Sequence, residues 1–166
     1  MKKIFYLFFA LPLLFISCDS DDDETYENIG TVEGVWGISS VSVNIETGNT
    51  LIDATLSAVL STFQGYAAAA EPDGYDFDSD GTFTYYFIED SAISSQGEGT
   101  YSLTTDSLYL TYNDTQTTET YKVVTASSST LQIRKSYLSD LASWGAALVG
   151  INIDSATATM TYAKSN

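Results

Sequence analysis

The sequence contains no histidine and only one cysteine, Cys18, among its 166 residues. Without histidine there is no Ser-His-Asp triad, no Cys-His pair and none of the usual histidine-bearing zinc sites. A single cysteine excludes an intramolecular disulfide, and no glycine-rich phosphate loop occurs. Carboxylates are the remaining candidates for catalysis. We therefore expect no catalytic residue, no cofactor and no metal centre, and we interpret the protein as not being an enzyme.

Basic residues are also scarce. Lysine and arginine together number 6 against 22 aspartates and glutamates, which gives a net charge of −16. Nucleic acid and anionic membrane surfaces would both repel such a chain, so nucleic acid is excluded as a partner. The length is sufficient for one domain with a substantial core, and we expect a monomer.

The one long apolar run lies at the N-terminus. Lys2 and Lys3 precede a 13-residue run from Ile4 to Ile16. As a helix this run would be about 20 Å long, too short for a bilayer core of about 30 Å. A basic leader followed by a short apolar run is typical of a signal peptide, which we place at residues 1–17.

The residues at the end of this run, Phe15-Ile16-Ser17-Cys18, resemble the lipobox of bacterial lipoproteins. Phenylalanine replaces the more usual leucine at the first position. The resemblance implies that signal peptidase II cuts before Cys18 and that Cys18 is the lipidation site. Each buried methylene of an acyl chain contributes about 0.8 kcal/mol, so several chains anchor a protein firmly. The expected partner is therefore the membrane, reached through the lipid on Cys18.

An acidic segment, DSDDDETYEN, follows from Asp19 to Asn28. Such a segment repels itself and stays extended, so it can serve as a plain tether. It is also similar to the export signal of surface lipoproteins in the Bacteroidota. We favour outer-membrane attachment with the domain exposed at the cell surface, and the periplasmic face stays the alternative. The predicted organisation is a signal peptide (1–17), a lipidated cysteine with tether (18–28) and one folded domain (29–166).

Alternating apolar residues predict a meander of antiparallel hairpins after this tether. In the first strand the alternation changes phase at Ser39-Ser40, which predicts a β-bulge. A sheet of eight strands can close into a barrel whose interior holds side chains or one small ligand. The predicted strands are residues 34–45, 75–77, 82–88, 99–104, 107–112, 117–125, 130–135 and 156–163.

Two segments have the period of a helix instead. Within residues 50–70, apolar residues such as Leu56 and Phe63 recur on one face, and Glu71-Pro72-Asp73-Gly74 predicts the end of the helix. A second helical pattern covers residues 137–149. The first helix is expected to act as a lid over a cavity or as a plug at one end of the barrel.

The motif Gly34-Val35-Trp36 is similar to the G-x-W of the first lipocalin strand. YDFDSDGTF, GTYSL, SLYLTY, TYKVV and TLQIRK follow it, and in this order the chain resembles the lipocalin-like lipoproteins of the Bacteroidota. The resemblance covers about residues 34–162. It implies a mainly β fold: an eight-stranded antiparallel lipocalin-like barrel, here with a helix between strands 1 and 2 and a second helix before the last strand.

Two features depart from the lipocalin pattern. Lipocalins usually carry their main helix after the barrel, whereas here a helix is predicted between the first two strands. They also pack a basic side chain, usually arginine, on the tryptophan of the first strand. Lys164 is the candidate for that place in this sequence.

Two kinds of function follow from a barrel of this size. The first is a binding protein for a small apolar or amphipathic ligand. The second is a surface module, with a filled barrel, that binds a glycan or a partner protein of an uptake complex through exposed tyrosines (Tyr86, Tyr109, Tyr137) and a loop from Glu89 to Gly99. The ligand lining expected for the first function is Trp36, Phe77, Phe83, Tyr85, Tyr101, Leu108, Leu110, Tyr121 and Ile133.

One further motif could suggest a metal. Asp76, Asp78, Asp80 and Gly81 have the spacing of the first half of an EF-hand calcium loop, but Phe87 occupies the place of its bidentate glutamate. Aspartate followed by glycine between alternating strands predicts a hairpin turn. We expect a hairpin whose aspartates face solvent, and weak surface cation binding at these three residues stays open.

Overall fold

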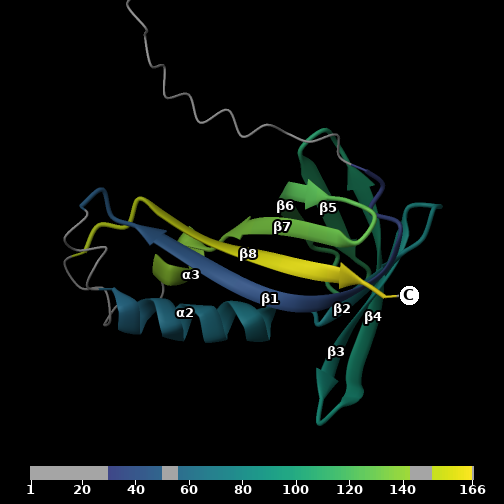
Figure 1. Cartoon of the computed structure of the whole chain (residues 1–166), viewed down its shortest axis with the longest axis horizontal. Coiled ribbons are helices and arrows are strands. Elements are labelled where there is room, and N and C mark those ends of the chain that lie inside the picture. The colour runs from purple at the N-terminus through teal and green to yellow at the C-terminus, as the bar shows by residue number, and fades with distance from the viewer. Residues whose placement is uncertain (1–29, 50–55, 143–150, 166) are drawn as a thin grey trace, which may run out of the picture.

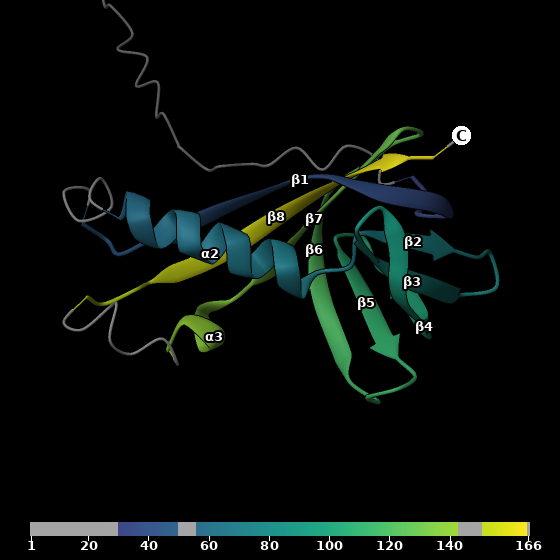
Figure 2. The same ribbon diagram turned by 90° about the horizontal axis from the view of Figure 1, so that it is seen from below.

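The computed structural model describes residues 30–49, 56–142 and 151–165. Eight antiparallel strands form a closed barrel in which each strand pairs with its neighbours in sequence and β8 pairs with β1 (Figures 1 and 2). The strands are β1 (Gly34–Glu46), β2 (Gly74–Phe77), β3 (Thr82–Glu89), β4 (Ala92–Leu103), β5 (Ser107–Tyr112), β6 (Thr118–Ala126), β7 (Thr130–Ser136) and β8 (Ser155–Lys164). The helices are α2 (Ser57–Ala70) and α3 (Leu138–Ala142).

The predicted fold class is confirmed, including the positions of both helices. The bulge is also confirmed, because the register of β1 against β8 shifts between Ile38 and Ser40. The signal peptide, Cys18 and the acidic tether lie outside the described residues, as do the first part of the helix predicted over 50–70 and the end of the one predicted over 137–149.

The prediction of a binding loop from Glu89 to Gly99 was wrong. This segment is a hairpin in which β4 begins at Ala92, and Asp90 and Ser91 form the turn with φ of 51° and 66°. Positive φ at both turn residues matches the right-handed twist of the flanking strands. The pattern was missed because this part of β4 is mostly polar and exposed on both faces, so no apolar alternation marks it as a strand.

Trp36 lies at one end of the barrel and is fully buried. Its Nε1 donates to the carbonyl of Val32 at 2.6 Å, so the segment before β1 folds over this end. The Nζ of Lys164 lies 5.2 Å from the centre of the indole and donates to the carbonyl of Glu33 at 2.8 Å. Lys164 therefore takes the place of the basic residue that lipocalins pack on this tryptophan, as predicted.

Helix α2 runs alongside β1 and protects an edge of that strand (Figure 2). β2 pairs only with Gly34 to Gly37, whereas β8 pairs with β1 as far as Glu46. The rest of the β1 edge is covered by α2, whose Gln64 donates from Nε2 to the carbonyl of Val41 at 2.7 Å. On the helix face turned inward, Phe63 is fully buried.

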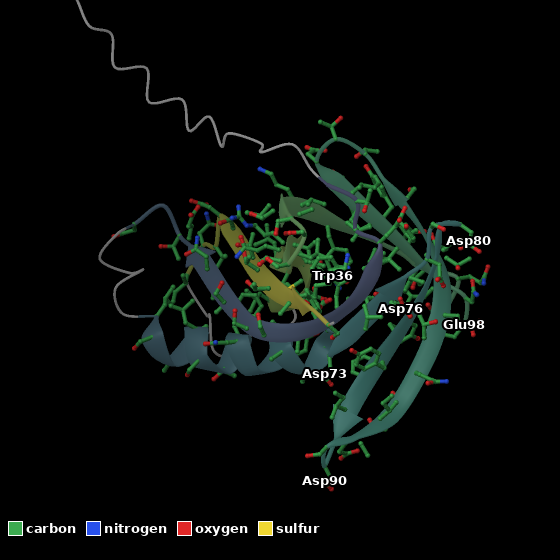
Figure 3. The ribbon with its side chains drawn as sticks, turned by 45° about the vertical axis from the view of Figure 1, so that its right-hand side comes forward. Trp36, Asp73, Asp76, Asp80, Asp90 and Glu98 are labelled. Carbon is green, nitrogen blue, oxygen red and sulfur yellow. The ribbon has the colours of Figure 1, made fainter. Side chains whose placement is uncertain are left out.

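The YDFDSDG stretch forms the β2–β3 hairpin, as predicted. Oδ1 of Asp80 accepts from the backbone N–H of Thr82 at 3.0 Å and from its hydroxyl at 2.6 Å, and Gly81 has a φ of 86°. Asp78 and Asp80 are exposed, and Asp76 is half-buried on the face opposite to the interior (Figure 3). Within the described ranges, no three acidic or cysteine residues gather in a way that could hold a metal ion.

No helix in the described ranges is both long enough and apolar enough to cross a membrane.

Candidate functional site

The two ends of the barrel differ in what covers them. Because the strands run up and down, the connections β1–β2, β3–β4, β5–β6 and β7–β8 all lie at one end, which we call the mouth. Both helices belong to connections at the mouth. The opposite end is the one closed by Trp36 and the residues before β1.

A buried carboxylate lies at the mouth. Glu71 directly follows α2 and is only 1% exposed. It accepts hydrogen bonds from the hydroxyl of Tyr121 at 2.8 Å and from the hydroxyl of Tyr137, and it pairs with Nζ of Lys135 at 3.0 Å. Three donors thus surround the carboxylate, which is what a buried charge requires.

A second carboxylate joins this group. Nζ of Lys135 lies 2.9 Å from Oε2 of Glu119, which also accepts from the hydroxyl of Tyr121. Burial lowers the pKa of Lys135, but the charge of Glu71 and the contacts with Glu119 outweigh this, so the pKa is raised above its ordinary value. Lys135 therefore stays charged at neutral pH. We call Glu71, Glu119, Tyr121, Lys135 and Tyr137 the tyrosine–carboxylate network.

Further buried tyrosines extend from the network into the barrel. The hydroxyls of Tyr75 and Tyr112 lie 3.3 Å apart, and the hydroxyl of Tyr162 donates to the carbonyl of Pro72 at 3.3 Å. Burial is the main cause that raises the pKa of each of these three tyrosines above the ordinary value of 10.0. They are therefore neutral hydrogen-bonding groups. In the described part of the chain, every buried side-chain nitrogen and oxygen has a partner.

A groove of about 210 Å³ lies beside the network, and we call it the mouth groove. Three aromatic side chains contribute to it: Tyr85 and Phe87 from β3, and Tyr112 from β5. The ring of Tyr85 is nearly perpendicular to the other two, at centre distances of 5.0 Å from Tyr112 and 6.1 Å from Phe87. The complete lining is Ala70, Pro72, Tyr85, Phe87, Tyr112, Asp114, Thr115, Thr117 and Glu119.

Two carboxylates line the mouth groove, those of Glu119 and Asp114. Oδ2 of Asp114 accepts from the hydroxyl of Tyr85 at 3.2 Å, and its Oδ1 accepts from the backbone N–H of Thr115 at 2.8 Å. Burial, together with the hydrogen bond and the charge of Asp114, raises the pKa of Tyr85. The ring and the carboxylate therefore form one fixed unit at the edge of the groove.

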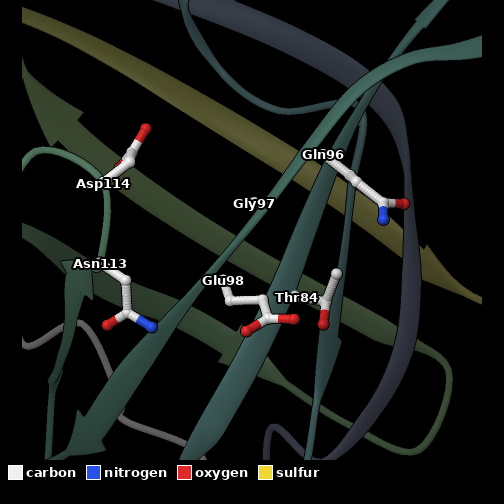
Figure 4. A pocket seen from close by; sticks show the side chains of 6 residues that line it. All are labelled: Thr84, Gln96, Gly97, Glu98, Asn113 and Asp114. Carbon is white, nitrogen blue, oxygen red and sulfur yellow. The ribbon is translucent and has the colours of Figure 1, made fainter.

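Asp114 also lines a second depression, of about 410 Å³, which has no aromatic residue in its lining (Figure 4). Gly97 of β4 lines this depression. A Cβ at this position would lie 2.4 Å from the hydroxyl oxygen of Tyr85, so the Tyr85 ring occupies the space that a larger residue would fill. We call this depression the side groove; its lining is Thr84, Gln96, Gly97, Glu98, Asn113 and Asp114.

The nine predicted lining residues lie on the inner face of the strands, where alternation places them. Seven of them are at most 2% exposed, and only Tyr85 and Tyr101 are half-buried. A side chain with no exposed surface borders no space that a water molecule can enter, so the barrel is filled where these residues meet. Of the nine, Tyr85 lines the mouth groove, and Tyr121 belongs to the tyrosine–carboxylate network.

The residues at the mouth were missed by sequence reasoning. The sequence indicates Glu71 only as part of the segment that ends a helix. Tyr137 was predicted to be exposed, and this was wrong: it is 2% exposed because α2 covers it, with Phe63 packed edge-on at 5.6 Å. Tyr86 and Tyr109, predicted with it, are half-buried. No spacing in the sequence links residues 71, 119 and 135, because the end of α2 and the strands β6 and β7 meet only in the folded barrel.

A family model matches most of the folded part of the chain. The family model described as a lipocalin-like domain matches residues 32–133, which extend from the segment before β1 to the middle of β7. No curated protein matches the chain.

Proposed function

The chain belongs to the lipocalin-like domain family, and from this premise we propose that it is a non-catalytic binding protein whose ligand site is the mouth groove. The observation that carries the proposal is the position of this groove: it lies at the mouth of a barrel whose deeper interior is filled. A ligand therefore docks at the mouth and does not enter the barrel.

The lining of the groove fits a small amphipathic ligand. Tyr85, Phe87 and Tyr112 offer ring surface, and the carboxylates of Asp114 and Glu119 and two threonine hydroxyls offer polar contacts. A hollow that combines aromatic ring surface with a few fixed polar groups suits a ligand that has an apolar part and a polar part. The end of helix α2 supplies Ala70 to one wall of the groove, and Pro72, which follows the helix, lines the groove as well.

Titration with Nile red, a neutral apolar dye, tests this proposal. We expect saturable binding that Phe87→Ala weakens about tenfold, because the loss of an aromatic wall costs about 1.5 kcal/mol. Tyr109→Ala is the matched control, because Tyr109 lies on β5 away from the groove and its loss leaves binding unchanged. Equal weakening by both variants, or no saturable binding to the wild-type protein, would rule out the mouth groove as the site.

The same proposal includes membrane attachment. The lipobox-like sequence ending at Cys18 and the acidic segment after it support a lipid-anchored protein of the outer membrane, with its domain at the cell surface. Metabolic labelling with palmitate is expected to label the wild-type protein and not Cys18→Ala. Protease added to intact cells is expected to remove the domain. An unlabelled wild-type protein contradicts the anchor, and a protected domain contradicts the outward orientation.

A second candidate function is the binding of a partner protein along β4. β5 pairs with Gly99 to Leu103, and no other strand in the described ranges pairs with residues 92–98 except β3. The β3–β4 hairpin thus projects with an edge that carries no second strand from Ala92 to Gly97 (Figure 1). At Glu98 the carbonyl already accepts from the backbone N–H of Asn113 at 3.0 Å. Ile88 and Ile93, paired near its tip, are 49% and 59% exposed. A free strand edge is a template for an added strand.

The occupant that fits this edge is an extended, basic segment of a partner. Glu98 and Asp114 line the side groove beside the edge, and its lining contains no basic residue. A peptide of alternating lysine and valine is expected to protect the amides of residues 92–98 from hydrogen exchange, and a peptide of alternating glutamate and valine is not. If neither peptide protects these amides, or if both do so equally, this second function falls.

A further inference from the structure

We propose that the ligand group recognised in the mouth groove is an organic ammonium ion. The inference rests on the proposed function of this groove and names the chemical class of its ligand. Two independent features of the site carry it: the arrangement of three aromatic rings, and the negative charge that surrounds them.

The rings provide more than one π face to a single small volume. Tyr85 stands at 84° to Tyr112 and at 89° to Phe87, so neighbouring walls of the groove meet nearly at right angles. A cation within about 6 Å of an aromatic ring is attracted to its face, and a quaternary ammonium ion, which offers no N–H, is held mainly in this way. Because both pairs pack edge to face, the three rings form one rigid aromatic wall on which an ammonium group can dock.

The charge around the groove favours a cation. Asp114, Glu119 and Glu71 bring three negative charges to the mouth, and Lys135 brings one positive charge, which leaves two in excess. None of the nine lining residues is basic. The hydroxyl of Tyr85 holds Asp114 beside the rings, so the charge is fixed where the ammonium group would lie. The net charge of −16 further steers cations toward the molecule and repels anions.

Other ligand classes fit less well. A divalent metal needs several oxygen ligands around one point, and no group of three acidic or cysteine residues in the described ranges could supply them. A carboxylate or phosphate would meet Asp114 and Glu119. A neutral apolar group gains from the rings alone and makes no use of the negative charge of Asp114.

The test compares choline with 3,3-dimethylbutanol, in which a carbon atom replaces the nitrogen and the charge is lost while the shape is kept. Binding is followed by amide chemical shifts of the lining residues. We expect choline to bind about tenfold more tightly, and this advantage to shrink at high salt. A third ligand, Nα-acetyl-lysine methylamide, shows whether a lysine side chain in a peptide is accepted as well as a free small cation.

Two matched variants locate the effect. Asp114→Asn is expected to reduce the ratio of choline affinity to 3,3-dimethylbutanol affinity about fivefold, because it removes the charge and keeps the shape. Asp106→Asn, in the β4–β5 turn at the opposite end of the barrel, is the control and leaves this ratio unchanged. Equal affinities for choline and its neutral counterpart overturn the ammonium assignment and leave the groove as an apolar site. Absence of binding by both, and by Nile red, removes the proposed function itself.

Discussion

Glu71 is the residue on which the mouth of the barrel depends. Among the described residues it is the one charged side chain that is buried, and its partners come from β6, β7 and the residue before α3. Charged groups are rarely buried unless they are paired and hydrogen-bonded. Glu71 therefore connects the end of α2 to three other parts of the chain.

Glu71→Gln is expected to destabilise the fold by about 2–3 kcal/mol, because a hydrogen bond to a charged group contributes about 1.5–3 kcal/mol and Lys135 loses one of its two partners. The NH₂ group of the new glutamine also faces the tyrosine hydroxyls and the lysine ammonium group, which are themselves donors. Urea unfolding followed by circular dichroism measures the change.

Glu119→Gln is the control for this prediction. Glu119 contacts the same lysine, but its side chain is 33% exposed, so water can replace the lost interactions. We expect a loss of less than about 1 kcal/mol. Equal losses for the two variants would show that burial of Glu71 contributes nothing special to the network.

Single residues also show what could be predicted from the sequence and what could not. Trp36 and its basic partner Lys164 were predictable. The G-x-W motif identifies Trp36, and Lys164 is a basic residue near the end of the last strand. Glu71 was not, because its role arises only when β6 and β7 are placed beside the end of α2. The inward phase of the strand residues was predictable, but whether they enclose a cavity depends on how their volumes add up in three dimensions.

At the scale of elements, α2 offers a direct test through its one internal glycine. Gly65 is exposed, has ordinary helical backbone, and a Cβ added there would meet nothing within 4 Å. Gly65→Ala is therefore expected to stabilise the protein by about 0.5–1 kcal/mol, since glycine is a poorer helix residue than alanine by that amount. A rise in the thermal midpoint measures this, and an unchanged or lower midpoint would contradict the packing described for α2.

Gly99 of β4 is expected to respond in the opposite way to the same change. A Cβ at this position would lie 2.3 Å from the carbonyl oxygen of Thr111 and 2.5 Å from the ring of Phe83. Because backbone cannot move aside as a side chain can, Gly99→Ala is expected to cost about 3 kcal/mol. Comparison of the denaturation midpoints of the two variants tests both expectations, and a tolerated alanine at position 99 would contradict the β4–β5 packing.

The strands differ in how well the sequence predicted them, for a physical reason. Strands with one buried face, such as β5 and β7, alternate clearly and were placed within a residue of their ends. The outer half of β4 projects beyond β5 and buries neither face, so its polar residues look like a loop. Alternation of apolar and polar residues indicates that one face of a strand is buried. A strand with no buried face lacks this pattern, which is why the free edge of β4 was missed.

At the scale of the whole molecule, the buried tyrosines make stability depend on alkaline pH. Burial is the main cause that raises the pKa of Tyr75, Tyr112, Tyr121, Tyr137 and Tyr162 in the folded protein. In the unfolded chain these groups ionise near the ordinary value of 10.0. Above that pH the unfolded state therefore binds fewer protons than the folded state, and stability falls as the pH rises. The raised pKa of Lys135 acts in the same direction.

The expected result is cooperative alkaline unfolding. Well above pH 10, five tyrosine protons released on unfolding lower the free energy of unfolding by up to about 7 kcal/mol per pH unit, because each proton contributes about 1.4 kcal/mol. A domain with a total stability of about 5–15 kcal/mol then unfolds within one to a few units, over a narrow range. Tyrosinate absorbance should rise in the same step in which the β-sheet circular dichroism is lost. If instead all tyrosines ionise gradually while the circular dichroism is unchanged, hydroxide reaches these hydroxyls in the folded state, and they are not buried as described.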